Sequence, residues 1–359
     1  MLTIRSVSIL AGCVPLILLP LCLSACDRQA SSRTTESQTS LVIAETSETV
    51  SCRLPDGSLS VLPKHPKRTV VLLTSLLDLW VQAGGAVVGR CAGDLRVPDR
   101  TRQAEEVGSF NNPNVEKIIA LEPDLVISSD VGNFRAIIPL LEQNDIAYAY
   151  FNYVNYYDYR HILDLFARIN GTRDRVDAAL EKMTVEVNRI IRDCAAYTPP
   201  RVLVIFTTSN SVSCELPGSQ VGVMLSLLGA ENVLSDQYRL RDKTRVDFSL
   251  ERIVQLEPDI ILLNTMGGVE ECRDRLRKEY ETNAAWSTLQ AIRNDRFHVL
   301  PKEYFLYKPN DEFPEALRYL AELLYLDFQA AVTKEDIPKN ERPTSNAQHP
   351  ISNERMVSR

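Results

Sequence analysis

The chain has 359 residues, of which 45% are hydrophobic and 24% are charged, and its formal net charge is −7. This length accommodates about two globular domains. The acidic balance argues against general nucleic-acid binding, because the chain offers no long basic stripe that could displace counterions from phosphates.

The first 25 residues have the pattern of a secretory signal. Arg5 precedes a largely apolar stretch, 7–23, and the segment ends in Leu-Ser-Ala-Cys. Small residues before a cleavage point favour an exported protein, the alternative being an uncleaved membrane anchor. The four-residue sequence resembles the bacterial lipobox, and this resemblance implies that Cys26 becomes a lipidated N-terminus.

Two polar stretches flank the predicted body of the protein. Residues 26–50 are rich in Ser, Thr and Glu and contain no aromatic residue, so they predict a lipidated flexible tether. Residues 334–359 are similarly polar and predict a frayed tail. No second apolar run of about 18 residues follows the signal. We therefore expect a soluble body that is anchored to the outer face of the cytoplasmic membrane, in the periplasm or at the cell surface.

Residues 51–172 predict an N-terminal α/β lobe. The pair Asp56-Gly57 lies between short alternating runs and predicts a β-hairpin. Beyond it, apolar runs typical of buried parallel strands alternate with runs of helical periodicity. The expected strands are 69–73, 86–91, 124–129 and 147–153, and the expected helices are 76–85, 115–123 and 137–146. This alternation predicts a parallel sheet with helices on its faces.

Residues 173–197 predict a single long helix between two lobes. Seven apolar side chains fall on one stripe at helical spacing: Val176, Leu180, Met183, Val187, Ile190, Ile191 and Cys194. Such a helix is roughly 35 Å long. The sequence Thr198-Pro199-Pro200 ends it.

Residues 198–333 predict a second α/β lobe. The expected strands are 201–208, 259–264 and 297–301, and the expected helices are 221–230, 249–258 and 311–326. The fold class is therefore α/β, with two Rossmann-like lobes that contain parallel sheets and are bridged by a single long α-helix.

Two stretches, 115–129 and 250–264, repeat one pattern at an offset of 135 positions. Six of the fifteen aligned positions are identical: Glu116/Glu251, Ile118/Ile253, Leu121/Leu256, Glu122/Glu257, Pro123/Pro258 and Asp124/Asp259. Each copy follows a candidate helix N-cap, Asn114 or Ser249. A fixed offset indicates two similar structural units in one chain.

Together, these features resemble the substrate-binding lipoproteins of ABC importers for iron-siderophores, haem or cobalamin. The resemblance covers residues 51–330 and is carried by the lipobox, the repeated elements, the long helix, the opening KHPKRTVVLL and the segment YKPNDEFPEALRYLAELLY. It implies a monomeric ligand receptor that performs no catalysis and has no cofactor of its own. Its transported ligand would be an iron chelate, haem or cobalamin, and its partner a permease dimer with its ATPase.

The resemblance also implies a role for the repeat. In this class, each lobe presents a glutamate to an arginine of the permease, and the matching residues here are Glu116 and Glu251. One acidic residue on each of two similar lobes suits a two-fold symmetric partner. The alternative is structural, since the helix dipole alone favours a glutamate just after an N-cap.

The ligand site is expected in the cleft between the lobes, at loops after the carboxyl ends of strands. Arginines before the second repeat would bind ligand carboxylates, although an ordinary solvated loop is an equal alternative. The candidate residues are Thr74, Ser75, Phe110, Asn111, Ser129, Asp130, Thr207, Thr208, Arg239, Arg241, Arg245, Met266, Tyr304 and Lys308.

Other classes of protein remain open as alternatives. A receptor for a bare divalent metal ion would need several converging ligands, but the chain has only four histidines, at 65, 161, 298 and 349. An exported enzyme is disfavoured because the common hydrolase, metalloprotease and P-loop motifs are missing. A lipoprotein adhesin leaves the repeat unexplained. Five body cysteines, an odd number, are expected to be mostly buried thiols: Cys52, Cys91, Cys194, Cys214 and Cys272.

Overall fold

The structure is a computed structural model that describes residues 40–93, 96–130, 132–235, 243–247, 249–325 and 328. The predicted signal, the lipidation site at Cys26 and the polar tail lie outside these residues. None of the described helices has the length and apolar character needed to cross a membrane.

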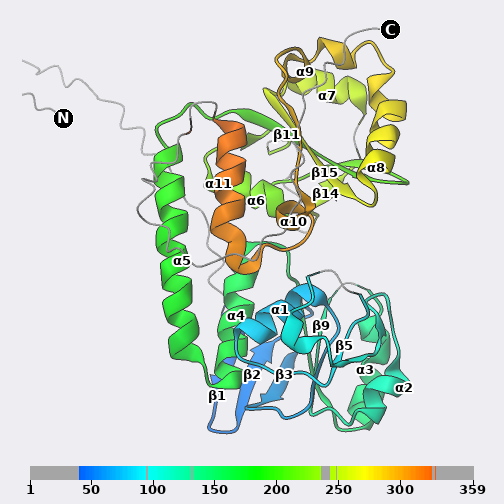
Figure 1. Ribbon diagram of the computed structural model, residues 1–359, viewed down its shortest axis with the longest axis vertical. Helices are drawn as coiled ribbons and strands as arrows, with labels where there is room; N and C mark the ends of the chain where they lie inside the picture. The colour runs from blue at the N-terminus through cyan, green and yellow to red at the C-terminus, as the bar shows by residue number, and fades with distance from the viewer. Residues whose placement is uncertain are drawn as a thin grey trace, which may run out of the picture. The chain divides into compact units, whose positions relative to one another are not determined.

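A three-stranded antiparallel sheet begins the described chain (Figure 1). Its strands are β1 (Val42–Glu45), β2 (Thr49–Arg53) and β3 (Leu59–Pro63). The expected hairpin turn is confirmed, because Gly57 adopts a positive φ of 87° and the Asp56 carboxylate accepts the Ser58 N–H at 2.9 Å. The expected tether boundary at residue 50 is wrong, because β1 and the start of β2 lie before it. Side chains alternate between the two faces of β2 and β3, and Val50, Cys52 and Leu62 all point into the core.

The N-terminal lobe is built on a five-stranded parallel sheet of order β10-β9-β4-β5-β6. The strands are β4 (Thr69–Val71), β5 (Gly89–Arg90), β6 (Glu105–Glu106), β9 (Leu125–Ser129) and β10 (Ala147–Phe151). Its helices are α1 (Thr74–Gln82), α2 (Val115–Ala120), α3 (Phe134–Gln143) and α4 (Tyr156–Asn170), and a short 3-10 turn spans Asp99–Thr101. All five residues of β9 are buried, as expected of a central parallel strand covered on both faces.

Helix α4 was not anticipated by the sequence analysis. Its N-terminus carries a capping box, in which the Asn155 side chain accepts the Tyr157 N–H and the Asp158 carboxylate accepts the N–H of Asn155 itself. Its C-terminus ends at Gly171, which has a left-handed φ of 66°. Its buried side chains, among them Tyr159, Ile162, Phe166 and Ile169, recur at helical spacing, so an apolar period was also present in the sequence.

Helix α5 (Arg173–Cys194) begins at the first residue of the predicted long helix and ends three residues before its predicted end. It packs against α4 of the N-terminal lobe and against α11 (Phe313–Leu324), which returns beside it (Figure 1). An ion pair between Glu186 and Arg318 joins α5 to α11. The lobes are therefore linked by a helical layer and not by flexible strands.

The C-terminal lobe contains a mixed sheet of order β14-β12-β11-β15-β16, with β13 paired to β11. Strands β11 (Arg201–Thr208), β13 (Glu231–Asn232), β15 (Ile260–Met266) and β16 (Phe297–Val299) are parallel to one another. Strand β12 (Val212–Glu215) is antiparallel to β11, and β14 (Arg245–Val246) is antiparallel to β12. The expectation of a purely parallel sheet is wrong here. A tight turn, with the Thr208 N–H donating to the Ser211 carbonyl at 2.9 Å, sends the chain straight back as a hairpin.

The remaining elements of this lobe cover its sheet or connect its strands. They are α6 (Gln220–Leu227), α7 (Leu250–Leu256), α8 (Val269–Leu276), a π-helical turn (Arg277–Glu281), α9 (Gln290–Arg293), α10 (Lys302–Phe305) and 3-10 turns at Trp286–Thr288 and Asn310–Glu312. The small hairpin β7 (Gly108–Ser109) and β8 (Asn112–Pro113) belongs to the N-terminal lobe.

Candidate functional site

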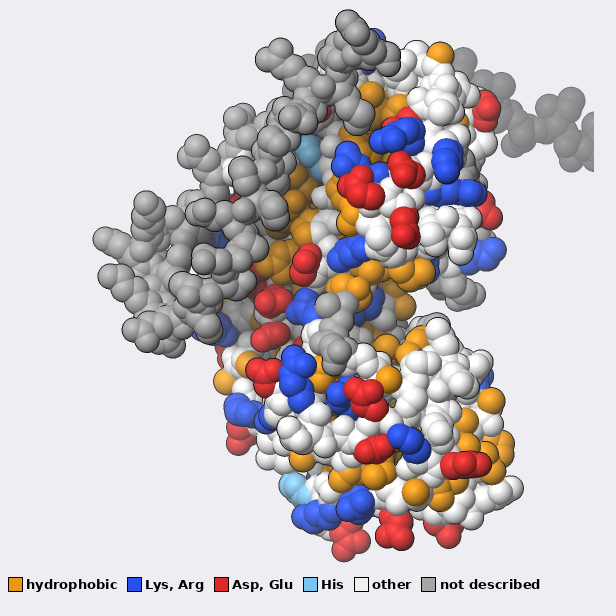
Figure 2. All heavy atoms as spheres, turned by 45° about the vertical axis from the view of Figure 1, so that its right-hand side comes forward, with side chains coloured by type: hydrophobic (Ala, Val, Ile, Leu, Met, Phe, Trp, Pro, Cys, Tyr) orange, Lys and Arg blue, Asp and Glu red, His pale blue; other side chains and the backbone are white. Residues whose placement is uncertain are grey.

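The candidate ligand site lies where the two sheets end, between the lobes. Figure 2 shows a notch between the upper, C-terminal lobe and the lower, N-terminal lobe. The carboxyl ends of β9, β11 and β15 carry Ser129, Thr208 and Met266, all predicted to bind ligand. Ligands of parallel α/β proteins bind at such strand ends.

On the N-terminal lobe, four predicted residues come together around the β7–β8 turn and the end of β9. The Asn133 side chain donates to the carbonyl of Asn111 at 2.7 Å, and the Phe110 ring lies beside Gly132, where a Cβ would meet it at 3.3 Å. Ser129 is buried at the end of β9. The next residue, Asp130, accepts a hydrogen bond from Arg135 at 2.7 Å. These contacts join two loops that are about twenty residues apart in the sequence into one surface.

Thr74 and Ser75 were expected in a loop, but they form the first turn of α1. Strand β4 ends at Val71, so only Leu72 and Leu73 connect it to α1. The Thr74 hydroxyl lies 3.5 Å from the Cys91 sulfur, and the Ser75 carbonyl accepts from the Asn310 side chain at 3.3 Å. Both residues therefore pack at the base of the cleft and not on a free loop.

On the C-terminal lobe, a hollow of about 360 Å³ is lined by cations and hydroxyl groups. Its lining residues are Phe206, Thr208, Ser211, Ser213, Lys243, Arg245, Val246 and Asp247. The Arg245 guanidinium stacks over the Phe206 ring, 4.0 Å from its centroid. Stacking holds the planar group in place while leaving its N–H groups able to bind an anion. The hollow thus has the chemistry of a site for a carboxylate or a similar oxyanion.

Three other predicted residues differ in how well they could contact a ligand. Thr207 has no exposed surface, because it points into the lobe while its neighbour Thr208 points out. Met266 is 49% exposed at the end of β15, which is unusual for a large apolar side chain. Tyr304 is partly buried in α10, where its carbonyl accepts a hydrogen bond from Gln220 at 2.7 Å. Only Met266 of these three offers a free apolar contact.

Lys308 lies at the junction of the lobes. Its ammonium group donates to the Val154 carbonyl at 2.6 Å and lies 5.5 Å from the Tyr153 ring centroid, both in the N-terminal lobe. Burial lowers the pKa of Lys308 to about 8, although the carboxylates of Asp158 and Glu215 oppose this effect. Glu215 is itself buried, with a raised pKa, and accepts from the Asn264 side chain at 2.9 Å. Lys308 therefore links the two lobes, and its predicted role as a ligand contact stays a prediction.

A second set of hydrogen bonds crosses the same junction from the turn at Asn310. The Asn310 amide donates to the Asp78 carboxylate at 2.5 Å and its carbonyl oxygen accepts from the Tyr153 hydroxyl. Arg96 pairs with Glu312 at 2.8 Å. These contacts, of which the Arg96–Glu312 pair is partly exposed, fix the floor of the cleft, and none of them was predicted from the sequence.

The titration of Lys308 predicts a pH-dependent stability. In the unfolded chain this amine holds its proton up to the ordinary lysine pKa of 10.5, whereas in the folded chain it loses the proton above about pH 8. Between these values the unfolded state binds more protons, so the free energy of unfolding rises with pH. Over the whole interval between these two pKa values, the gain in the free energy of unfolding amounts to about 3 kcal/mol, at 1.36 kcal/mol per pH unit.

The measurement compares urea unfolding of the wild-type protein and Lys308→Met at pH 7, 8, 9 and 10. Below pH 8 the free energies of unfolding of the two proteins should differ by a constant amount. Above pH 8 the wild type should gain stability relative to the variant. Parallel curves up to pH 10 would show that Lys308 titrates normally.

The sequence repeat corresponds to two helices with the same local structure, α2 and α7, one in each lobe (Figure 1). Both expected N-caps are confirmed: Asn114 accepts the Lys117 N–H at 3.0 Å, and Ser249 accepts the Arg252 N–H at 3.4 Å. Glu116 and Glu251 are exposed second residues of their helices.

The other identities of the repeat have structural reasons. Asp124 accepts the N–H groups of Lys67 and Arg68 at 2.6 and 3.0 Å, and Asp259 accepts the N–H of Arg201 at 2.8 Å. The guanidinium groups of Arg68 and Arg201 then reach back to the last carbonyls of α2 and α7, those of Leu121 and Leu256. Asp124 therefore fastens the end of the α2 segment to the start of β4, and Asp259 fastens the end of the α7 segment to the start of β11.

Removing either aspartate should destabilise the protein. Asp124→Ala leaves two backbone N–H groups without their acceptor and should lower the free energy of unfolding by about 1–3 kcal/mol. Asp259→Ala should act in the same direction. Glu181→Ala, at an exposed position of α5, is the control and should shift stability by no more than ~0.5 kcal/mol. Urea denaturation measures all three, and equal stability of all variants would contradict the structural role.

Two predicted residues, Arg239 and Arg241, lie outside the described residues. The sequence analysis missed Phe206 and Ser213, which line the hollow. Phe206 lies in β11 and pairs with Ser213 of β12, so the place of both residues beside Arg245 depends on the antiparallel pairing of these two strands. It also missed Glu215, because a charge inside a strand gives no sign of its buried partners.

The structure also bears on metal and thiol chemistry. Within the described part of the chain, no group of three or more His, Cys, Asp or Glu side chains could hold a metal ion. The described histidines lie on separate elements: His65 follows β3, His161 is in α4 and His298 is in β16. All five body cysteines are free and buried. Burial raises the pKa of Cys52 and Cys214 to about 12, so these thiols are unreactive.

Comparison with known proteins places this geometry in a family. A family model described as periplasmic binding protein matches residues 70–304. The high-affinity heme uptake system protein IsdE of Staphylococcus aureus strain Newman is 25% identical over 267 residues, which cover 72% of this chain and 86% of that protein.

Solved structures show the same fold. An ABC transporter substrate-binding protein from Listeria monocytogenes EGD-e has a TM-score of 0.63 and 21% identity, covering 74% of this chain and all of that one. Staphylococcus aureus SirA complexed with staphyloferrin B has a TM-score of 0.60 and 20% identity, covering 76% and 96% of the two chains. The match confirms the predicted architecture of two α/β lobes, with the cleft between them.

Proposed function

The chain belongs to the periplasmic binding protein family, and from this membership we propose that it is the ligand receptor of an ABC importer. It captures a chelated-iron compound, a siderophore or haem, or else cobalamin, in the cleft between its lobes and delivers it to the permease. It acts as a monomer and carries out no chemistry on the ligand.

The hollow around Arg245 is the observation that carries the choice of ligand. Two cations, Lys243 and Arg245, and three hydroxyl groups line it, against the single carboxylate of Asp247. Such a set favours an anionic ligand, because charge-assisted hydrogen bonds to oxyanions are the strong ones. Relatives named for haem uptake or solved with staphyloferrin B support an iron compound. Among the candidate ligands, anionic chelates and haem propionates fit this chemistry better than cobalamin.

Delivery requires a partner and a location. We place the permease contacts at Glu116 and Glu251, since both carboxylates are exposed at matching positions of α2 and α7. The burial and hydrogen bonding at the lobe junction favour small lobe movements on binding. The signal pattern and Cys26 favour lipid attachment on the outer face of the membrane.

The proposal is tested by titrating ligand-free protein, with the chain complete from Cys26, against a panel of compounds. The panel contains ferric carboxylate, catecholate and hydroxamate chelates, haem, cobalamin and the free ions Mn²⁺, Zn²⁺ and Fe³⁺. Saturable 1:1 binding of an anionic iron compound is expected, measured by calorimetry at fixed salt. Binding of a free divalent ion alone would establish a metal-ion receptor instead. Turnover of any compound would contradict the non-catalytic role.

A further inference from the structure

The outer face of the N-terminal sheet is unusually apolar. Ile43 is 44% exposed, Leu59 56% and Val61 57%, although the inward side chains of the same sheet, Val50 and Leu62, are fully buried. Single exposed aliphatic residues are common on protein surfaces, but three on one small sheet are a patch.

Strand register places these side chains on one face of the sheet, on the two strands that flank β2. Ser51 of the middle strand pairs with Ala44 on one side and with Val61 on the other, so all three share the outer face. Arg53 pairs with Leu59 in the same way. A register shift between Val42 and Ala44 leaves both Ile43 and Ala44 exposed. The outer face therefore consists of aliphatic groups with one arginine and small polar residues among them.

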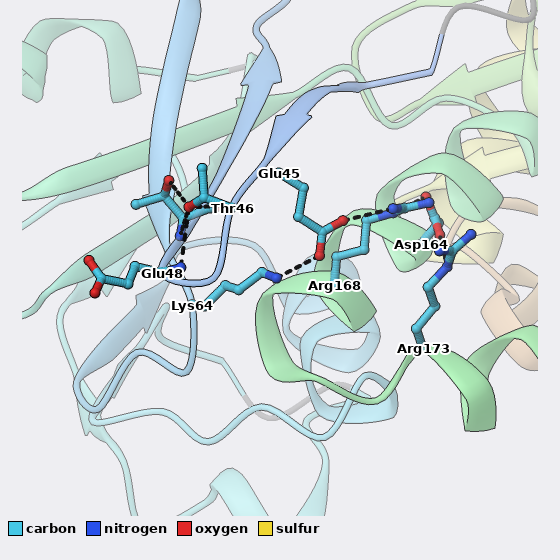
Figure 3. Close-up of polar contacts among 8 residues, drawn as sticks. Glu45, Thr46, Glu48, Lys64, Asp164, Arg168 and Arg173 are labelled. Atoms are coloured by element: carbon cyan, nitrogen blue, oxygen red, sulfur yellow. Dashed lines mark hydrogen bonds and ion pairs between the residues drawn. The ribbon is translucent and has the colours of Figure 1, made fainter.

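The sheet is fastened to the rest of the lobe. The Glu45 carboxylate of β1 accepts from Lys64 at 2.6 Å and from Arg168 of α4 at 2.9 Å (Figure 3). Arg168 also pairs with Asp164 at 2.9 Å. The Ser60 hydroxyl donates to the Tyr148 carbonyl of β10 at 2.5 Å. Because the sheet is held from both sides, whatever binds its outer face also orients the whole N-terminal lobe.

Chain length indicates what covers this face. Ser40 follows Cys26 by 14 residues. A flexible polar chain of this length has an end-to-end distance of roughly 20 Å. If Cys26 carries lipid, as the proposed function states, β1, the first strand of the described chain, stays within about this distance of the bilayer. Aliphatic side chains accompanied by a basic residue are the composition that settles into a lipid interface.

We propose that the outer face of this sheet, formed by Ile43, Ala44, Leu59 and Val61, rests on the lipid surface to which the chain is tethered. Without the lipid anchor the affinity of this face for lipid would be weak, but the tether keeps the local concentration of lipid high. It holds the receptor in a defined orientation near the membrane between encounters with the permease. This inference rests on the proposed lipid anchor.

The test places a tryptophan on the face and measures its distance from lipid. A chain beginning at Cys26 and carrying Val61→Trp is coupled through that thiol to maleimide-lipid vesicles, since the five body cysteines are buried. Chemical coupling makes the result independent of whether the cell lipidates Cys26. Val185→Trp, at a 66% exposed position of α5, is the matched control. The native Trp80 and Trp286 are buried and give the same background in both.

Bromine-labelled lipids should quench the tryptophan at position 61 at least threefold more than the one at position 185. Adding Ile43→Ser and Leu59→Ser to Val61→Trp should reduce this quenching to the control level. Equal quenching at both positions overturns the proposal. Absent quenching together with a dimer mass in solution also overturns it, and assigns the face to a second copy of the chain. Neither result affects ligand binding in the panel titration, so this inference and the proposed function fail separately.

Discussion

Ligand uptake is expected to stop when Glu116 and Glu251 are both replaced by alanine, while ligand affinity stays the same. Each carboxylate is exposed on its own lobe, and within the described residues neither forms an ion pair with another side chain. Truncating one partner of a charge pair buried at an interface typically costs about 2–5 kcal/mol. Each single variant should therefore reduce uptake at least about tenfold, and the double variant should abolish it.

The measurement is uptake of radioactive iron or labelled ligand into cells that carry only the variant receptor. The matched control is Glu181→Ala with Glu322→Ala, which removes two exposed carboxylates from α5 and α11. That control should transport normally. Parallel titrations of the purified proteins establish the affinity. An equal loss of affinity and uptake would mean that the two glutamates are structural, and normal uptake would place the docking contact elsewhere.

Arg245→Glu is expected to weaken ligand binding by about 30- to 100-fold. The substitution removes a cation from the hollow beside Phe206 and puts a carboxylate next to Asp247, so an anionic ligand loses a hydrogen bond to a charged group and meets repulsion. Hydrogen bonds to charged groups contribute about 1.5–3 kcal/mol. Arg245→Lys should lose less affinity, because it keeps the charge and gives up only the planar geometry.

The control for Arg245 is Arg192→Glu, which reverses an exposed charge on α5. It changes the net charge of the protein equally but lies outside the hollow, so its affinity should match the wild type within twofold. The affinity loss of Arg245→Glu should also shrink as salt rises, since the charge is exposed to solvent. Equal affinities of both variants would remove the cationic hollow from the ligand site.

The architecture could be predicted from the sequence because it follows from periodicity. Short apolar runs such as 124–129 and 201–208 are typical of strands with both faces covered, and the stripe on α5 is long and regular. The repeat predicted two similar lobes, and the caps at Asn114 and Ser249 located both of its helices. Local signals of this kind depend on residues that are close in the chain.

What the sequence did not reveal depends on contacts between distant segments. Helix α4 is an exception, because its caps and the helical spacing of its buried side chains are local signals that the prediction overlooked. Lys308 and Glu215 have the sequence pattern of ordinary surface charges, yet tertiary contacts bury Glu215, partly bury Lys308 and change the pKa values of both. Thr207 was indistinguishable from Thr208 until the pleat of β11 showed which of them points into the cleft. The ligand site was therefore predicted at the level of strand ends, and individual side chains needed the structure.

The most direct test of the receptor function is native mass spectrometry, with absorbance spectra, of the protein isolated from its own host under iron limitation. The proposed function predicts a 1:1 complex with a coloured, iron-containing organic anion. The Arg245→Glu variant isolated in the same way should carry far less of it. A protein that carries only a divalent metal ion, or no ligand at all under these conditions, would contradict a receptor for iron chelates.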